Sequence, residues 1–151
     1  MSDLRDLYQE VILDHCKKPR NFGRMEGADG SAEGFNPLCG DRVTVFLKMK
    51  NGTVEEVRFQ GAGCAISTAS ASMMTEALKG KTRAEAEALF EKFHELVTHE
   101  PSSPVGTAGL GKLAVFSGVR EFPMRVKCAT LAWHTLRAAL NHEQKTVSTE
   151  E

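Results

Sequence analysis

The feature that most constrains the fold is Asn51-Gly52, a dipeptide that favours a tight two-residue turn between antiparallel strands. Before it, apolar and polar residues alternate over 43–47, which is typical of a strand with one buried face. After it, residues 54–59 form a plausible return strand. The sequence therefore predicts a β-hairpin near the middle of the chain.

Helical patterns flank this hairpin on both sides. Apolar residues at helical spacing predict an N-terminal helix over about 3–16, and a glycine-rich stretch over 27–34 predicts irregular chain or a weak edge strand. Thr82 and Glu85 form a capping box, and Pro123 is placed to open a last helix. The helices expected after the hairpin cover about 64–78, 82–97, 110–117 and 123–141.

This order of elements predicts one α+β domain over residues 1–151, in which a small antiparallel sheet of about three strands packs against helices. A chain of 151 residues can bury about 70% of its unfolded surface, so its core needs no metal or disulfide to hold together. The polar residues over about 143–151 are expected to form a frayed tail.

Charge and hydropathy exclude several classes of function. Lys and Arg total 19 and Asp and Glu total 20, a balance that argues against broad binding to nucleic acid or to anionic membranes. The N-terminal residues lack the apolar segment of a secretory signal, and no apolar run approaches the ~20 residues of a membrane span. We therefore expect a cytoplasmic protein, in which the four cysteines are metal ligands, reactive thiols or small buried hydrophobes.

Three of these cysteines occupy unusual positions in the chain. Cys39 lies in a turn-forming loop that begins at Asn36, and Asp41 follows it by two residues, so a thiolate and a carboxylate can face one centre. Cys64 follows a Gly-Ala-Gly turn at the expected start of a helix, where free amides and the helix dipole favour a thiolate. Cys128 lies in the first turns of the last helix.

If these segments meet, Cys39, Asp41, Cys64 and Cys128 would suit a tetrahedral Zn²⁺ ion. The spacing of 25 and then 64 residues between the cysteines fits no compact zinc finger, so buried, unliganded cysteines remain the alternative. Cys16 follows His15 on the expected N-terminal helix, and the side chains of adjacent helical residues point about 100° apart. The two are therefore poorly placed to bind one metal ion, and we expect Cys16 to have a packing role.

Segments 36–41, 61–67 and 125–131 resemble, in the same order, the three cysteine motifs of the IscU/NifU-N-type family of iron–sulfur cluster assembly proteins. Residues 12–15 and 19–23 resemble the N-terminal helix and following loop of that family, so the resemblance covers about 4–141. Scaffold members carry a histidine before the third cysteine, whereas this chain carries Lys127 and a long insertion over about 80–121. Both the lysine and the insertion resemble those of the SufU branch of the family.

The resemblance implies an IscU/SufU-like fold and a zinc site made by Cys39, Asp41, Cys64 and Cys128. It also implies a sulfurtransferase that serves as co-substrate and activator of a SUF-type cysteine desulfurase. In that role Cys39 accepts the persulfide sulfur, after a histidine of the docked desulfurase replaces it on the metal, and the sulfur passes to downstream iron–sulfur assembly proteins. Arg125 is a candidate for orienting the side chain of Cys39 or Asp41, with an ordinary surface salt bridge as the alternative.

Two other functions would use the same residues. The first is a scaffold on which a [2Fe–2S] cluster is built and then transferred, and the second is a structural zinc module without chemistry. Lys127 disfavours the scaffold because an ammonium group has no lone pair to give to a metal, which leaves Asp41, or a water molecule, as the fourth ligand.

Overall fold

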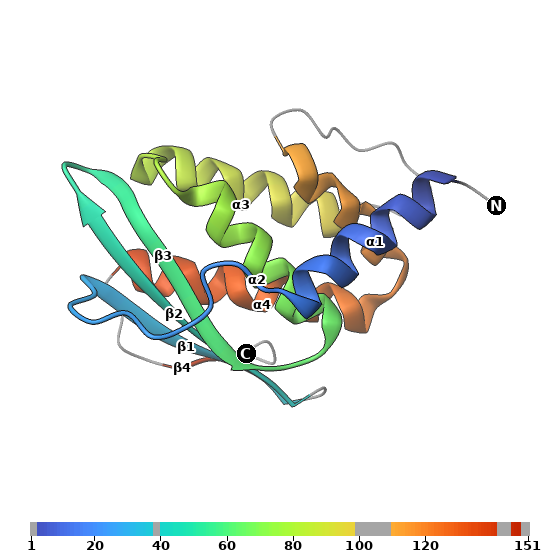
Figure 1. Cartoon of the computed structure of the whole chain (residues 1–151), viewed down its shortest axis with the longest axis horizontal. Coiled ribbons are helices and arrows are strands. Elements are labelled where there is room, and N and C mark those ends of the chain that lie inside the picture. Colours follow the sequence, from blue (N-terminus) through green and yellow to red (C-terminus); the bar gives the residue numbers. More distant parts are fainter. Residues whose placement is uncertain (1–2, 38–39, 99–109, 142–145, 149–151) are drawn as a thin grey trace.

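The computed structural model describes residues 3–37, 40–98, 110–141 and 146–148, and the account that follows is confined to them. Its sheet has the strand order β3-β2-β1-β4 (Figure 1). Strands β1 (Gly30–Asn36), β2 (Asp41–Lys50) and β3 (Thr53–Ala62) are antiparallel neighbours. Asn51 and Gly52 have φ angles of 54° and 79°, the left-handed values that a two-residue hairpin turn requires. The predicted hairpin and the antiparallel sheet are thus confirmed.

The fourth strand, β4 (Thr146–Ser148), runs parallel to β1 along the edge of the sheet. It lies inside the segment expected to be a frayed tail, and in these three residues the structure differs from that expectation. Strand addition at an edge uses backbone N–H and C=O groups, which every residue here offers whatever its side chain. A polar tail therefore gives little sequence signal of such pairing.

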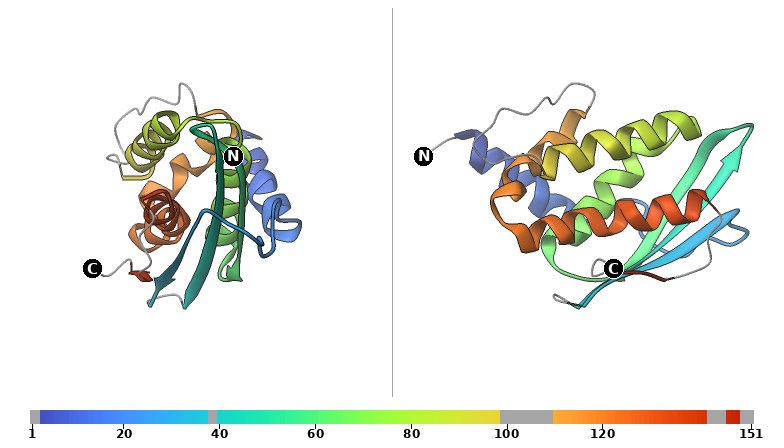
Figure 2. Two further views of the ribbon diagram at one scale, coloured as in Figure 1. Left: turned by 90° about the vertical axis from the view of Figure 1, so that its left-hand side faces the viewer. Right: turned by 180° about the vertical axis from the view of Figure 1, so that it is seen from behind.

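The described chain also contains four α-helices and one 3-10 helix. They are α1 (Asp3–Lys17), α2 (Ala65–Leu78), α3 (Arg83–Thr98), the 3-10 helix η1 (Gly111–Glu121) and α4 (Pro123–Leu140). Helix α4 packs against β1 and β2 and lies across that face of the sheet in Figure 2, while α2 packs against α4 and β3. Helix α1 packs on α2 and η1.

The helix boundaries follow local sequence signals. The backbone N–H of Thr82 donates to Oε1 of Glu85 at 2.9 Å, and the N–H of Glu85 donates to Oγ1 of Thr82 at 3.1 Å, which is the predicted capping box before α3. The helix expected over 110–117 is longer and of the 3-10 type, extending to Glu121. No helix in the described part of the chain combines the length and the apolar character needed to cross a membrane.

The aromatic centre of the core joins α2, α3, η1 and α4. Trp133 stacks on Phe93 with ring centroids 4.7 Å apart, and Phe93 meets Phe116 edge to face at 5.6 Å. The indole N–H of Trp133 donates to Oγ of Ser70 at 3.2 Å, and the Ser70 hydroxyl donates to the carbonyl of Ala129 at 2.6 Å. This pair of buried hydrogen bonds ties α2 to the turn of α4 that follows Cys128.

Two glycines let β1 approach α4 very closely. A Cβ on Gly34 would lie 2.0 Å from Oγ1 of Thr135, and a Cβ on Gly30 would lie 2.4 Å from the carbonyl oxygen of Ala139. The glycine-rich segment is therefore irregular over 27–29, as one reading of the sequence expected, and from Gly30 on it is strand β1, whose inner face has no room for larger side chains. Its close contact with α4 brings the end of β1 next to Cys128.

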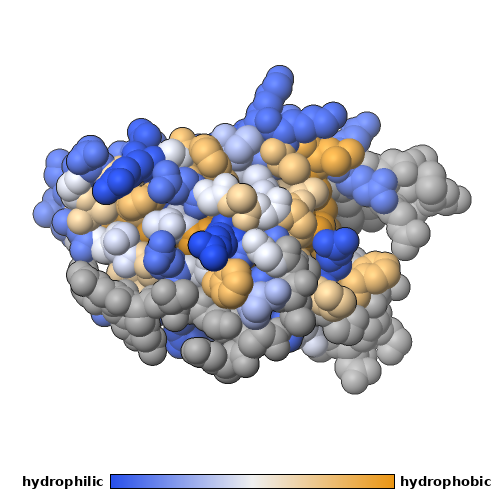
Figure 3. All heavy atoms as spheres, turned by 90° about the horizontal axis from the view of Figure 1, so that it is seen from below, coloured by the Kyte–Doolittle hydropathy of each residue, from blue (hydrophilic) through white to orange (hydrophobic). Residues whose placement is uncertain are grey.

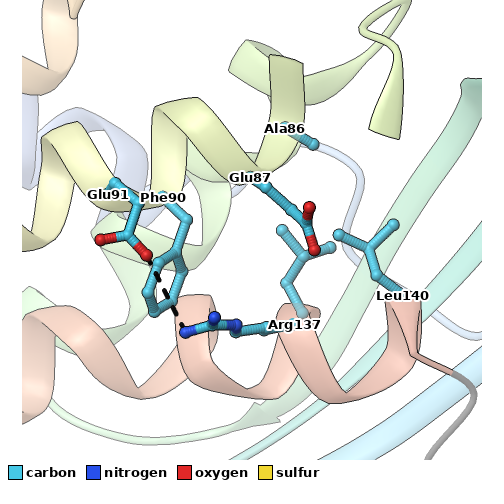
Figure 4. Close-up of a pocket in the computed structure, with 7 residues that line it drawn as sticks. Ala86, Glu87, Phe90, Glu91, Arg137 and Leu140 are labelled. Atoms are coloured by element: carbon cyan, nitrogen blue, oxygen red, sulfur yellow. Dashed lines mark ion pairs between the residues drawn. The ribbon is translucent and has the colours of Figure 1, made fainter. Parts of the chain in front are cut away.

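Helices α3 and α4 also meet at the surface, at the end of α4 far from Cys128. Phe90 lies between the two helices, with the guanidinium of Arg137 over its ring at 5.1 Å (Figure 4). Arg137 also forms an ion pair of 4.0 Å with Glu91. Because both charged side chains are exposed, this pair contributes little to stability.

Candidate metal centre

Asp41, Cys64 and Cys128 converge at one end of the sheet. Their ligand atoms all lie within 4.8 Å of one another. Asp41 is the first residue of β2, Cys64 is the N-cap of α2, and Cys128 lies in the second turn of α4. Three segments that are distant in sequence thus bring a carboxylate and two sulfurs together.

The Asp41 carboxylate is completely buried and is held by the start of α2. Its Oδ1 atom accepts a hydrogen bond of 2.9 Å from the backbone N–H of Cys64, and its Oδ2 atom lies 3.7 Å from Sγ of Cys64. One oxygen is therefore anchored by the backbone while the other faces a sulfur. The free amides at the N-terminus of α2 also offset part of the cost of burying this negative charge.

Cys64 caps α2 with its own sulfur, because Sγ accepts a hydrogen bond of 3.4 Å from the backbone N–H of Ser67. An amide donor at a helix start stabilises the thiolate relative to the thiol. Gly61, with φ at +148°, allows the chain to reach this position, since a Cβ there would lie 2.1 Å from the carbonyl oxygen of Arg42. The helix begins where the Gly-Ala-Gly turn predicted it.

Cys128 is completely buried on α4, and its sulfur lies 3.7 Å from Nδ2 of Asn36, which is also completely buried. Asn36 is the last residue of β1 and pairs with Asp41, the first residue of β2. The sequence analysis used Asn36 only as part of a turn. Its place beside the sulfur could have been inferred only from the pairing of the two strand ends, which puts Asn36 opposite Asp41.

Three further candidates from the sequence are Cys39, Arg125 and Cys16. Cys39 lies outside the described residues, so its part in the site stays a prediction from the sequence. Arg125 lies three residues before Cys128 on α4 with an exposed side chain, and its orienting role also stays a prediction. Cys16 is half-buried on α1 and is not in the ligand group that the described residues form.

His15 belongs to the fold rather than to this centre. It is buried, its Nδ1 atom lies 2.8 Å from Oγ of Ser72, and its Nε2 atom lies 3.6 Å from Oε1 of Glu76. Burial, which disfavours the charged imidazolium, lowers the pKa of His15 below its usual value. The backbone N–H of Arg20 donates to the same Ser72 hydroxyl oxygen at 2.8 Å. The contacts of His15 and Arg20 thus fix the end of α1 and the chain that follows it to α2.

The geometry leaves room for a divalent ion. Three atoms no more than 4.8 Å apart lie within about 2.8 Å of a common point, which follows from the geometry of a triangle. That is about 0.5 Å longer than a Zn–S bond of about 2.3 Å, so small side-chain shifts would bring all three to bonding distance. Two thiolates and a carboxylate are donors that zinc and iron both accept.

Comparison with known proteins gives the same assignment as the motifs. The model of the NifU-like N terminal domain family matches residues 7–129. The chain is 38% identical over 143 residues to the zinc-dependent sulfurtransferase SufU of Bacillus subtilis, with 95% of each chain covered. It is 40% identical over 140 residues to the iron–sulfur cluster assembly scaffold protein IscU of Streptococcus pyogenes serotype M1, covering 93% of this chain and 86% of that one.

Comparison with solved structures gives the same family. A putative iron–sulfur cluster assembly scaffold protein for the SUF system from Fervidobacterium islandicum superposes with a TM-score of 0.81 at 36% identity, covering 90% of this chain and 98% of that chain. The IscU/SufU-like α+β fold is thereby confirmed. Since the family match spans most of the chain and relatives near 40% identity cover more than nine tenths of it, this chain belongs to the family of NifU-like N-terminal domains, among its IscU and SufU relatives.

Proposed function

We propose that this chain is a zinc-dependent sulfur carrier, which accepts persulfide sulfur from a cysteine desulfurase and relays it for iron–sulfur cluster assembly. The observation that carries the proposal is the convergence of Asp41, Cys64 and Cys128 within 4.8 Å. The 38% identity to a relative named as a zinc-dependent sulfurtransferase supports the choice of zinc and of sulfur transfer. Lys127, where scaffold members of the family carry a histidine, points the same way.

Four residues would hold the ion: Cys39, Asp41, Cys64 and Cys128. Bound zinc would supply a positive charge that keeps the cysteines as thiolates at neutral pH. The protein supports the same state through the amide N–H groups that already face Asp41 and Cys64. Both donors are backbone groups, so the orientation of Asp41 and Cys64 does not depend on flexible side chains.

The four proposed ligands come from different kinds of element. Cys64 and Cys128 are carried by helices that pack against each other. Cys39 is in the four-residue connection, 37–40, between β1 and β2. Reactive residues occur more often on connections than on the elements that they join, so we assign the leaving and reacting role to Cys39.

The transfer step needs only the Cys39 thiolate and the desulfurase persulfide. The thiolate attacks the outer sulfur, a new S–S bond forms on Cys39, and the S–S bond to the desulfurase cysteine breaks. The desulfurase cysteine leaves as a thiolate with the electron pair. The transferred sulfur keeps its oxidation state, so no external oxidant or reductant is consumed.

The surface near the start of α4 supports docking of a protein partner at this site. Phe122 is 60% exposed and Met124 is 55% exposed, although both are large apolar side chains within a few residues of Cys128. Apolar side chains that stay exposed among charged ones are typical of interaction surfaces. Figure 3 shows one face of the molecule on which apolar patches lie between strongly hydrophilic side chains.

The experiment compares Cys39→Ala with Cys16→Ala, a matched control in which a half-buried cysteine outside the ligand group is removed. Each protein is incubated with a SUF-type cysteine desulfurase and cysteine, and alanine release, bound zinc and the mass of each cysteine-containing peptide are measured. We expect wild type and Cys16→Ala to gain sulfur on Cys39 and to stimulate the desulfurase. Cys39→Ala should do neither, and full stimulation by this variant would rule out Cys39 as the acceptor.

A second variant tests the ligand set. Asp41→Ala removes a buried carboxylate whose two oxygens face Cys64, so zinc affinity should fall. Competition with a chromogenic chelator measures that affinity. If the affinity of Asp41→Ala equals that of wild type, Asp41 is not a ligand and the fourth position belongs to water or to another group.

The second candidate function is a scaffold for a [2Fe–2S] cluster, favoured by the 40% identity to a relative named as a scaffold protein. Thiolates with a carboxylate can hold iron as well as zinc. Purification without oxygen, followed by analysis of zinc, iron and acid-labile sulfide, separates the two. Stoichiometric zinc without sulfide supports the carrier, whereas iron and sulfide in equal amounts support the scaffold.

A further inference from the structure

The two strand ends of the β1–β2 hairpin each contact one of the helix-borne cysteines. At the start of β2, Asp41 accepts the backbone N–H of Cys64 at 2.9 Å. At the end of β1, the side-chain amide of Asn36 lies 3.7 Å from the sulfur of Cys128. Asn36 and Asp41 are cross-strand partners. The residues that close the hairpin are therefore also the residues that touch the metal centre.

The chemistry of the sulfur decides which atom of the Asn36 amide faces it. A thiolate can only accept hydrogen bonds, so it favours the NH₂ group over the carbonyl oxygen of the side chain. Asn36 and Cys128 are both completely buried, where water cannot solvate a negative sulfur. An amide donor at this place stabilises a charge that would otherwise be costly to bury.

Asn36 also holds the connection that carries Cys39. Its backbone carbonyl accepts the N–H of Gly40 at 2.8 Å, which closes the chain across residues 37–40. One residue thus contacts Cys128 through its side chain and fixes both ends of the Cys39 connection through its backbone.

We propose that Asn36 is a positioning residue of the metal centre: its side-chain N–H donates to the sulfur of Cys128 and keeps this cysteine as the ligand that stays. The inference rests on the proposed function, since it assumes that the centre binds a metal and that Cys39 accepts the sulfur. A hydrogen bond to a metal-bound thiolate withdraws negative charge from the sulfur and lowers its reactivity. Asn36 thereby helps to direct sulfur chemistry to Cys39 rather than to Cys128.

The direct test leaves the sequence unchanged. In protein loaded with ¹¹³Cd, a hydrogen bond from nitrogen to a cadmium-bound sulfur transmits a scalar coupling between the amide proton and the metal. We expect such a coupling for the side-chain amide protons of Asn36. If those protons are assigned and show no coupling to cadmium, the hydrogen bond does not exist and the proposal fails.

A variant tests the consequence for the metal. Asn36→Leu keeps most of the volume and removes the donor, and Thr135→Val is the control because it removes a buried hydroxyl from α4 that bonds to Leu131 instead. With Co²⁺ bound, the sulfur-to-metal charge-transfer band of Asn36→Leu should move to lower energy, because the sulfur electrons are less stabilised. Zinc affinity should fall roughly 10- to 100-fold, as for other residues that support a ligand.

The outcomes separate this proposal from the function. Unchanged Co²⁺ spectrum and zinc affinity in Asn36→Leu, in a protein that still accepts sulfur on Cys39, would overturn the role of Asn36 and leave the carrier function intact. Failure of the wild-type chain to bind any metal would instead overturn the proposed function. If Asn36→Leu does not fold, the cadmium coupling in the unchanged chain still decides the question.

Discussion

Gly63 lies directly against the carboxylate of Asp41. A Cβ added at position 63 would lie 2.8 Å from Oδ1 of Asp41, closer than real Cβ contacts come. The absence of a side chain at Gly63 is therefore what lets Asp41 reach the backbone N–H of Cys64. Gly63 is therefore part of the candidate metal centre, although it offers no ligand atom.

We expect Gly63→Ala to weaken metal binding without unfolding the protein. The added methyl group must displace the Asp41 carboxylate, and loss of support for a ligand typically costs about tenfold or more in metal affinity. Zinc or cobalt titration against a competing chelator measures the change. Gly118→Ala is the matched control, since a Cβ at Gly118 meets nothing within 4 Å. Equal affinities in the two variants would contradict the contact.

Gly34→Ala should destabilise the whole domain. Its methyl group would collide with Oγ1 of Thr135 at 2.0 Å and would crowd Leu131, and overpacking of this kind costs roughly 1–3 kcal/mol. The free energy of unfolding in urea measures the loss, with Ser31→Ala on the exposed face of β1 as the control. Adding Thr135→Ala should restore part of the stability, and a double variant no more stable than Gly34→Ala alone would argue against this contact.

Ser70→Ala should cost roughly 1–3 kcal/mol of stability, because the indole N–H of Trp133 and the carbonyl of Ala129 would lose a partner inside the core. Urea unfolding followed by far-UV circular dichroism measures this loss in every variant, including those that lack Trp133, the only tryptophan of the chain. Combining it with Trp133→Phe removes the orphaned N–H, so the double variant should lose less than the two single losses added together. Strict additivity would mean that the two side chains are not coupled.

The stability of the domain should depend on pH through His15. Burial lowers the pKa of His15, and the charges of Arg20 and Lys112 act in the same direction, whereas Glu76 and Asp14 oppose it. In the unfolded chain the imidazole binds a proton near pH 6.5, so acid favours the unfolded state. The contribution of His15 is present above about pH 6.5 and is lost as the pH falls from there towards the lowered pKa of the folded state.

Unfolding in urea at several pH values between about 5 and 8 tests this dependence. His15→Gln should flatten the curve, and Glu76→Gln should steepen it, because removing the opposing carboxylate lowers the pKa of His15 further. His134, whose pKa is also lowered by burial, remains in both variants and contributes the same background. A His15→Gln curve as steep as that of wild type would contradict a buried, neutral His15.

Much of the fold and part of the centre could be predicted because their signals are local. Asn51-Gly52 sets the hairpin through backbone angles that few other residues adopt, and Thr82 with Glu85 starts α3 through hydrogen bonds three residues apart. The Gly-Ala-Gly turn before Cys64 likewise predicted the start of α2. Each signal lies within a few neighbouring residues, so it can be recognised before anything is known of the rest of the chain.

The tertiary structure decided what depends on contacts between distant segments. The cysteine motifs alone left open whether Asp41, Cys64 and Cys128 meet, and no pattern in residues 143–151 marks the pairing of β4 with β1. The contact between Asn36 and Cys128 joins positions 92 residues apart, and it exists only because glycines let β1 lie against α4. Backbone pairing and close approach leave little trace in any one segment, since each is a property of two surfaces that come together only when the chain folds.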